Sequence, residues 1–499
     1  MKMRALLCLA FFALVLAGCA SDAINRAAPS PEAPWVADGQ QGRAAGAPDF
    51  SVPAEPQLSL VSTPVSVNVD RTYGLAELID LAQRTNPATR HAWEVSRQAA
   101  LASGMVEATY LPLISATVIA GRQKTSTSID VPPIGAVDVD TTLKGVTPVL
   151  ALQWLVFDFG QRAALSEAAR QLSFAANVTF NATHQKLIFD ITRRYYEHGA
   201  AIEAHRIAGQ TLTNSKSVLR AVEARLAQGR ATTIDLALAR QQVAQSELRL
   251  VRAAAQEQDT YQTLLDAMGV NATLKLKVEA AGRRRLPDRL DTLTQSVLES
   301  ALQRRPDLLA SFAAMKAGEA QVKAAKAGLM PKVLVAGTLA SNSSKFHVGN
   351  LPDVGSPTAQ SGVLVVASMP LFDGGLRMAQ VKNAQAGADA AAETFRQVQL
   401  AAISEIVVAS NALGTALAAN KAAGVLVQTS TTAFDAAMAA YRNGLATLAT
   451  VNETNTTLLD ARLAKADAEV ATLIAAANLA FFTGALTSVD AIPGRISTR

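Results

Sequence analysis

The chain has 499 residues, of which 49% are apolar and only 5% aromatic, and its formal net charge is +5. This length allows two or three ordinary domains or one large one, and the shortage of aromatic residues argues against a large aromatic-rich core. Because the charges are scattered along the chain, they indicate no nucleic-acid-binding surface.

The N-terminus predicts export. Lys2 and Arg4 precede an apolar run, Ala5 to Leu16, that is too short to span a membrane. The run ends in Leu16-Ala17-Gly18-Cys19, which resembles the lipobox of bacterial lipoproteins, where cleavage precedes the cysteine and its thiol is acylated. We therefore predict a signal peptide over 1–18 and a covalent N-terminal lipid on Cys19; an ordinary signal with a chance cysteine is the alternative. The absence of Asp after the cysteine implies the outer membrane.

The next segment, 19–70, is rich in Pro, Ala, Gly and Ser and has little periodicity, so it reads as an extended tether behind the lipid. Cys8 would leave with the signal peptide. The mature chain would then keep one cysteine, used for lipid, and could form no disulfide within a protomer.

The rest of the chain is an internal duplication. The matched landmarks are Asn86-Pro87 with Arg305-Pro306, Tyr110-Leu111-Pro112 with Leu329-Met330-Pro331, Phe157-Asp158-Phe159-Gly160-Gln161-Arg162 with Phe372-Asp373-Gly374-Gly375-Leu376-Arg377, Gly229 with Gly444, and Gly269 with Gly484. One change of length in a loop accounts for the single change of spacing between the copies.

Each copy predicts a helix, two strands and a long helical hairpin. The first copy, 71–270, has a helix from Leu75 to about Glu107 broken near Pro87, strands at about 113–123 and 143–157 around a loop at 124–140, a long helix at about 161–227, a tip near Gly229 and a returning helix to about Met268. At 1.5 Å per residue, the long helix would span about 100 Å.

The second copy, 292–486, follows a connector at 271–291 and precedes a C-terminal tail at 487–499. Its predicted parts are a helix from about Leu293 to Lys326 broken near Pro306, strands at about 332–342 and 362–372 around a loop at 343–360, a long helix at about 376–442, a tip near Gly444 and a returning helix to about Phe482.

The predicted strands alternate apolar and polar residues, as strands between lipid and water do. One face of the first strand carries Ile114, Ala116, Val118 and Ala120, and the fourth carries Val363, Val365, Ala367, Met369 and Leu371. Ordinary sandwich strands would give the same pattern. In a barrel, Trp154, Phe157 and Phe372 are the candidate aromatics at the membrane interface.

Four strands are too few to close a membrane barrel, which needs roughly eight. Open sheet edges are not tolerated in lipid. Several copies must therefore share one barrel: two would supply eight strands and three would supply twelve, and the sequence does not choose between them.

These residues resemble the TolC-like outer-membrane efflux proteins, over roughly Leu75 to Leu486. The resemblance rests on the duplicated unit, on Arg304-Arg305-Pro306-Asp307-Leu308, on Pro370-Leu371-Phe372-Asp373-Gly374-Gly375, and on the two glycine tips. It implies a mainly α fold with a transmembrane β part, a homotrimer with a 12-stranded barrel, and an antiparallel helical tunnel in the periplasm. It also implies an outer-membrane channel of a tripartite efflux or type I secretion system, docked to a periplasmic adaptor and an inner-membrane transporter.

The resemblance further implies that function lies at the hairpin tips. Arg225, Gly229 and Asp235 fit the family's tip pattern in the first copy, and Tyr441 and Gly444 fit it in the second. The family's first acid is replaced by Thr450 and its tip arginine by Ala446, while Glu453 keeps an acid one turn later.

The candidate aperture residues are therefore Glu453, Asp235 and Tyr441, with Arg225, Gly229 and Gly444 as tip or adaptor contacts. Acids repeated around an axis would favour cations. The alternative role for both acids is helix capping, in Thr232-Thr233-Ile234-Asp235 and Thr450-Val451-Asn452-Glu453.

No motif for catalysis, phosphate binding or a metal appears, so we expect no enzyme and no cofactor beyond the lipid on Cys19. The expected partners are further copies of the chain, the adaptor, the transporter and outer-membrane lipid, with no nucleic acid. A periplasmic adaptor or structural coiled-coil lipoprotein without a pore is the competing hypothesis. The cargo stays open.

Overall fold

In a computed structural model, the structure describes residues 28, 30–31, 68–133, 135–279, 294–348, 352 and 354–486. The chain divides into two units, 1–62 and 63–499, and the account below concerns the second. The predicted signal peptide, Cys19, nearly all of the tether, most of the connector and the C-terminal tail lie outside the described residues.

Each copy opens with a helix interrupted at a proline, as predicted. The helices are α3 (Leu75–Thr85), α4 (Pro87–Ala108), α7 (Gln295–Leu302) and α8 (Pro306–Ala327). Asn86 and Arg305, the residues before the prolines, have ψ of 124° and 122°. Proline disfavours the helical region for the residue that precedes it, so both helices break at this point.

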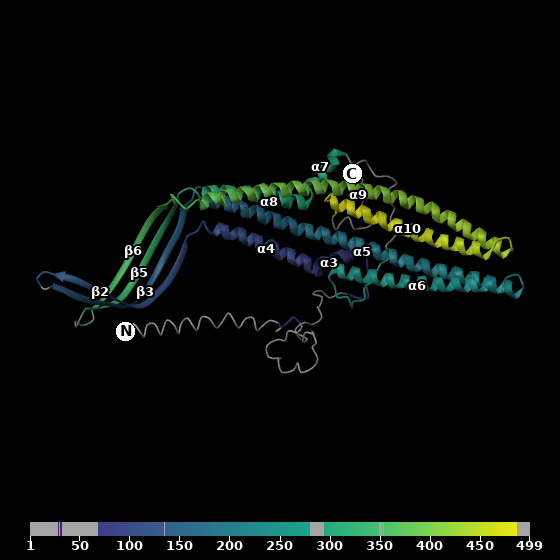
Figure 1. The fold of residues 1–499 in the computed structure, drawn as a ribbon, viewed down its shortest axis with the longest axis horizontal. Helices are drawn as coiled ribbons and strands as arrows, with labels where there is room; N and C mark the ends of the chain where they lie inside the picture. Colours follow the sequence, from purple (N-terminus) through teal and green to yellow (C-terminus); the bar gives the residue numbers. More distant parts are fainter. Residues whose placement is uncertain are drawn as a thin grey trace, which may run out of the picture. The chain divides into compact units, whose positions relative to one another are not determined.

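The long hairpins are confirmed with the predicted bounds. Helix α5 (Gln161–Ala227) returns as α6 (Thr233–Met268), and α9 (Leu376–Arg442) returns as α10 (Leu448–Phe482); α5 and α9 have 67 residues each. Along α5 lie α4, α3 and α6, and along α9 lie α8 and α10 (Figure 1). The shorter helices of each copy thus share the length of its long helix, as expected.

The described strands of the larger sheet have the order β2-β3-β5-β6, with all neighbours antiparallel. They are β2 (Leu113–Val131), β3 (Gly135–Phe157), β5 (Lys332–Val348) and β6 (Val354–Ser368). The predicted loops at 124–140 and 343–360 are wrong over most of their length, because pairing continues through them, as between Lys124 and Thr142. Their Thr and Val residues favour extended backbone. The last strand ends at Ser368, shortly before Pro370, so Phe372 lies beyond it.

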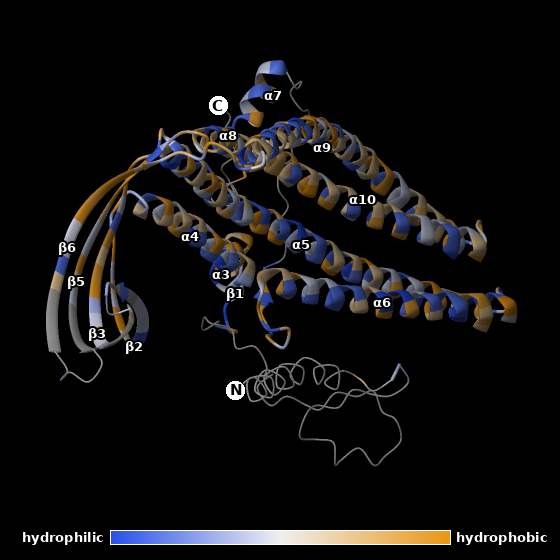
Figure 2. Ribbon diagram, turned by 60° about the vertical axis from the view of Figure 1, so that its left-hand side comes forward, coloured by the Kyte–Doolittle hydropathy of each residue, from blue (hydrophilic) through white to orange (hydrophobic). Residues whose placement is uncertain are grey.

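The register brings apolar residues of all four strands together on one face. One row across the sheet pairs Ile114 with Leu152, Leu152 with Gly337, and Gly337 with Val363. The next row toward the helices includes Trp154, Val335 and Val365. The opposite face mixes polar residues such as Ser115, Thr117, Gln153, Thr338 and Lys332 with apolar ones. Figure 2 shows hydrophobic residues gathered on the strand ends nearest the helices.

A small parallel sheet fixes the start of the first copy to the start of the connector. It pairs β1 (Thr72–Tyr73) with β4 (Lys277–Val278). Around it lies the largest apolar cluster, in which Leu78, Ile191, Leu264 and Met268 are fully buried. This cluster joins α3 to α5 and to the C-terminal end of α6.

Candidate functional site at the hairpin tips and the strand–helix junctions

Both hairpin tips turn on a glycine in the left-handed region, as predicted. Gly229 has φ of 68° and Gly444 has φ of 80°. In the first tip the amide of Arg230 donates to the carbonyl of Arg225 at 2.8 Å, and in the second the amide of Leu445 donates to that of Ala440 at 2.8 Å. This is the bond pattern that ends a helix at a left-handed glycine, so the two tips share one geometry.

Arg225 connects the two tips. Its Nη1 donates to the backbone carbonyl of Tyr441 at 2.5 Å, and its Nη2 donates to the carbonyl of Arg230 at 3.3 Å. The guanidinium also lies 4.8 Å from the centre of the Tyr441 ring. A Cβ at Gly444 would lie 3.8 Å from both terminal nitrogens of Arg225. The Arg225 guanidinium therefore contacts both hairpins at their turns.

Tyr441 lies in an apolar cluster between the hairpins. It is 4% exposed and packs with Val218 and Val222 of α5 and with Val451 of α10. Burial raises the pKa of its phenol above the ordinary value, partly offset by the charge of Arg225. In this protomer Tyr441 thus serves the contact between hairpins, and its predicted place in an aperture remains a proposal.

Asp235 caps α6. The amides of Asp235 and Thr232 bond to each other's side chains, at 3.1 Å and 2.8 Å. These hydrogen bonds from Thr232, with a smaller contribution from the charge of Arg225, hold the pKa of Asp235 below its ordinary value. The predicted capping pattern around Asp235 is confirmed.

The corresponding prediction for the second tip is wrong. Helix α10 begins at Leu448, and Thr447 is its N-cap, with the Thr447 hydroxyl accepting from the amide of Thr450 at 3.2 Å. The cap therefore lies three residues before the predicted position, in register with Thr232 of the first copy. Glu453 does not cap the helix. It is exposed, and its carboxylate makes no ion pair among the described residues.

A polar layer that the sequence analysis missed lies farther from the tips. The Ser215 hydroxyl contacts the Ser246 hydroxyl at 2.9 Å and accepts from Nδ2 of Asn455 at 3.4 Å. These side chains come from α5, α6 and α10 and are 1 to 2% exposed. The layer joins three helices of the two hairpins, and only the tertiary contact between them shows it.

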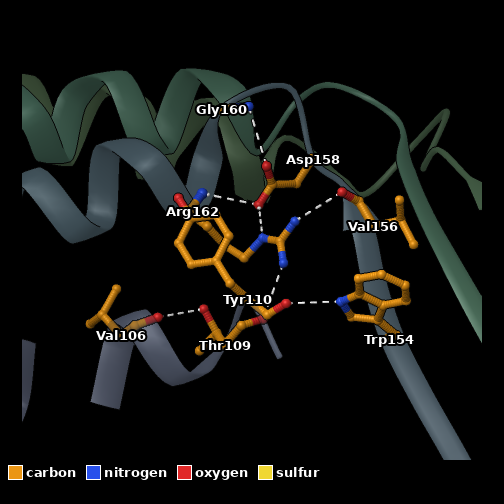
Figure 3. Close-up of polar contacts among 8 residues, drawn as sticks. All are labelled: Val106, Thr109, Tyr110, Trp154, Val156, Asp158, Gly160 and Arg162. Atoms are coloured by element: carbon orange, nitrogen blue, oxygen red, sulfur yellow. Dashed lines mark hydrogen bonds and ion pairs between the residues drawn. The ribbon is translucent and has the colours of Figure 1, made fainter. Parts of the chain in front are cut away.

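A second missed cluster lies where β3 passes into α5 (Figure 3). Nε of Arg162 donates to Asp158 at 2.8 Å, Nη1 donates to the carbonyl of Thr109 at 3.1 Å, and Nη2 donates to that of Val156 at 3.2 Å. The guanidinium lies 4.6 Å from the centre of the Tyr110 ring. Arg162 and Asp158 side chains are 8% and 7% exposed, so this ion pair is buried.

The same arrangement recurs more loosely in the second copy. Nη1 of Arg377 donates to the carbonyl of Gly328 at 2.5 Å, and its Nε lies 3.5 Å from Asp373, with both side chains about one-third exposed. The spacing of Asp158 and Arg162, repeated in Asp373 and Arg377, was the available signal in the sequence for both junctions.

The predicted interface aromatics lie around these junctions. Nε1 of Trp154 donates to the carbonyl of Tyr110 at 2.8 Å, which holds the indole at the end of β3. The Phe157 ring meets Phe159 edge to face at 4.7 Å, and Phe372 is 91% exposed. All three predicted residues therefore lie at the helix end of the sheet.

Among the residues that the structure describes, no three His, Cys, Asp or Glu side chains are grouped to hold a metal ion. His198 contacts Thr260, and His205 contacts Glu257 at 2.6 Å, so each pairs with its own neighbour on α6.

Comparison with known proteins decides the family. The model of the outer membrane efflux protein family matches residues 78–270 and 297–485, which are the two copies of the repeat. The chain belongs to this family. It is an outer-membrane channel subunit, as the resemblance implied.

Individual relatives of this outer membrane efflux protein are distant. It is 28% identical to the pyoverdine export outer membrane protein OpmQ of Pseudomonas putida, over 81% of this chain and 84% of OpmQ. It is 26% identical to the outer membrane protein OprJ of Pseudomonas aeruginosa, over 58% of this chain and 59% of OprJ. A membrane protein of Pseudomonas aeruginosa has the same fold, with a TM-score of 0.70 and 23% identity over 87% of this chain and 99% of that one.

Proposed function

We propose that three copies of this chain form one 12-stranded channel that passes cargo from an inner-membrane transporter across the outer membrane. The observation that carries the proposal is the sheet: four strands, one mainly apolar face, and outer strands β2 and β6 with no further partner among the described strands. Unpaired edges are unstable in lipid, and further copies would satisfy them. Trimeric rather than dimeric closure follows the family resemblance.

Exposed apolar residues on α9 support assembly of the helical part. Three of them are about 60% exposed: Leu400, Val408 and Val425. By length and composition, α9 is also the one described helix that is apolar enough to cross a membrane. In the trimer, neighbouring copies would cover this face, because such side chains are seldom left in water over a long stretch.

The tips form the proposed aperture. Three copies of Glu453 and Asp235 would face the axis and favour cations, and Tyr441 would take part through its contact with Arg225. Gly229 and Gly444 shape the turns that an adaptor would contact. The resemblance implies an arginine at the second tip, where this chain has Ala446. Closure of the aperture would therefore depend on Arg225 of the first tip instead.

The acyl chains on Cys19 would attach the chain to the membrane in addition to the barrel. Cys19 would bear the acyl chains, each buried methylene contributing roughly 0.8 kcal/mol, and Trp154, Phe157 and Phe372 would lie at the periplasmic interface. The name of OpmQ refers to pyoverdine export, and this chain would likewise pass cargo that its transporter selects.

The test is reconstitution of the purified chain into planar bilayers. We expect a heat-sensitive trimer on gels and discrete single-channel conductance. A monomer that stays soluble after the lipid is removed, with no conductance, would refute the channel and favour the adaptor.

A further inference from the structure

The apolar face of the four-stranded sheet contains a groove. It has a volume of about 430 Å³ and is lined by Ile114, Leu150, Leu152, Gly337, Leu339 and Val363, among others. This volume falls within the range of small-molecule sites, roughly 300 to 1,000 Å³. We propose that the groove binds one acyl chain of a phospholipid from the periplasmic leaflet.

A missing side chain makes the groove. In the row that runs from Ile114 through Leu152 and Gly337 to Val363, only the third position lacks a Cβ. A Cβ at Gly337 would lie 3.6 Å from that of Leu152, in ordinary contact, so the backbone does not require glycine there. Glycine weakens a strand interior and often marks a close approach of a ligand.

The position of the groove indicates its occupant. The groove runs across the face of the sheet from Ile114 of β2 to Val363 of β6, with the central strands β3 and β5 between them, so copies that pair with the strand edges would leave this face open. Its lining is exposed in the protomer, with Ile114 at 60% and Val363 at 75%. On the face that the proposed barrel turns toward lipid, an open apolar groove fits a hydrocarbon chain.

Its depth selects the leaflet. Trp154 lies two residues from Leu152 on the same face, or about 7 Å at 3.3 Å per residue. Tryptophan favours the membrane–water interface. The indole is held at the helix end of the strand by its bond to Tyr110, so the groove lies just inside the hydrocarbon on the periplasmic side.

The proposal rests on the proposed barrel, and the test separates the two. The chain has three tryptophans, and Trp35→Phe with Trp93→Phe leaves Trp154 as the single fluorophore. The channel would be reconstituted into vesicles of phosphatidylethanolamine that carries bromine on one acyl chain, and quenching of Trp154 would give a relative lipid-binding constant. We expect Gly337→Leu to lower this constant about threefold, as the loss of roughly five carbon–carbon contacts between groove and acyl chain would do.

Gly362→Leu is the matched control: Gly362 pairs with Thr338 beside Gly337, and although its backbone borders the groove, its side chain would face the opposite side of the sheet. It should leave quenching unchanged. If Gly337→Leu does not assemble, Gly337→Ala should give a smaller loss. Unchanged quenching in the Gly337 variants, with conductance intact, would overturn the lipid site alone. An equal loss of quenching in Gly362→Leu would likewise overturn the lipid site. Absence of Trp154 quenching in the chain with both glycines would show that the opposite face meets lipid and would overturn the assigned barrel orientation too.

Discussion

The guanidinium of Arg225 in the first hairpin lies over the ring of Tyr441 in the second, and it donates to the backbone carbonyl of the same residue. The cation–π contact contributes roughly 0.5 to 2 kcal/mol and the hydrogen bond from a charged donor roughly 1.5 to 3 kcal/mol. Both interactions span the gap between hairpins, so they favour the state in which the tips are together.

Arg225→Ala should therefore destabilise the closed tips by about 2 kcal/mol. The expected result is a larger and longer-lived conductance in planar bilayers. Arg230→Ala is the control, because the exposed Arg230 contributes only its backbone carbonyl to the contact. Equal conductance in the two variants would mean that Arg225 does not hold the tips together.

Asp235 should make the start of α6 dependent on pH. Its pKa is lowered in the folded state, so its stabilising contribution is complete above the ordinary value of 3.8 and is lost as the pH falls through the lowered pKa. Hydrogen exchange of the amides at 232–236 should accelerate in Asp235→Asn at neutral pH, and this difference should vanish in acid.

The second tip offers a matched gain-of-function variant. Thr450 occupies the position of Asp235 relative to the cap at Thr447. Thr450→Asp should slow exchange at the start of α10 at neutral pH and give it the same acid sensitivity. If exchange there does not respond, the acid at this position does not act through capping.

The two strand–helix junctions should differ in their sensitivity to mutation. Arg162→Ala leaves buried Asp158 without its partner and should cost roughly 3 to 5 kcal/mol. Arg377→Ala acts on a pair whose side chains are about one-third exposed, and it should cost about 1 kcal/mol. The temperature at which the oligomer dissociates on gels, corrected for expression, would compare them, and equal losses would show that burial of the first pair does not matter.

Glu453→Gln should reduce the preference of the channel for cations, because the exposed carboxylate would be repeated around the axis. The reversal potential in a salt gradient measures this preference. Glu94→Gln is a suitable control, since that exposed carboxylate lies on α4 and pairs with Arg97. Because Glu453 does not cap α10, unchanged selectivity would leave it without a role.

The sequence predicted the elements better than the contacts between them. Proline at Pro87 and Pro306 and glycine at Gly229 and Gly444 act on the local backbone, so the breaks and tips were found to the residue. The strands are longer than predicted. The Pro, Gly, Ser and Asp residues that predict loops favour turns locally, whereas pairing with the neighbouring strand keeps these segments extended. The pairing of Arg225 with Tyr441 depends on how two distant hairpins pack, which no spacing within either hairpin contains.

The hydroxyl and amide layer at Ser215, Ser246 and Asn455 has a consequence for motion. Outward along the hairpins, the apolar contacts of Val218 and Val222 lie between this layer and the ends. Separating the hairpins at Val218 and Val222 exposes apolar side chains to water. Water can replace each hydrogen bond of the hydroxyl and amide layer at little net cost. The hydrogen bonds of the layer are nevertheless directional, so they fix one axial register between the hairpins. We therefore expect the tips to move apart by rotation about Asn455, without sliding of one hairpin along the other.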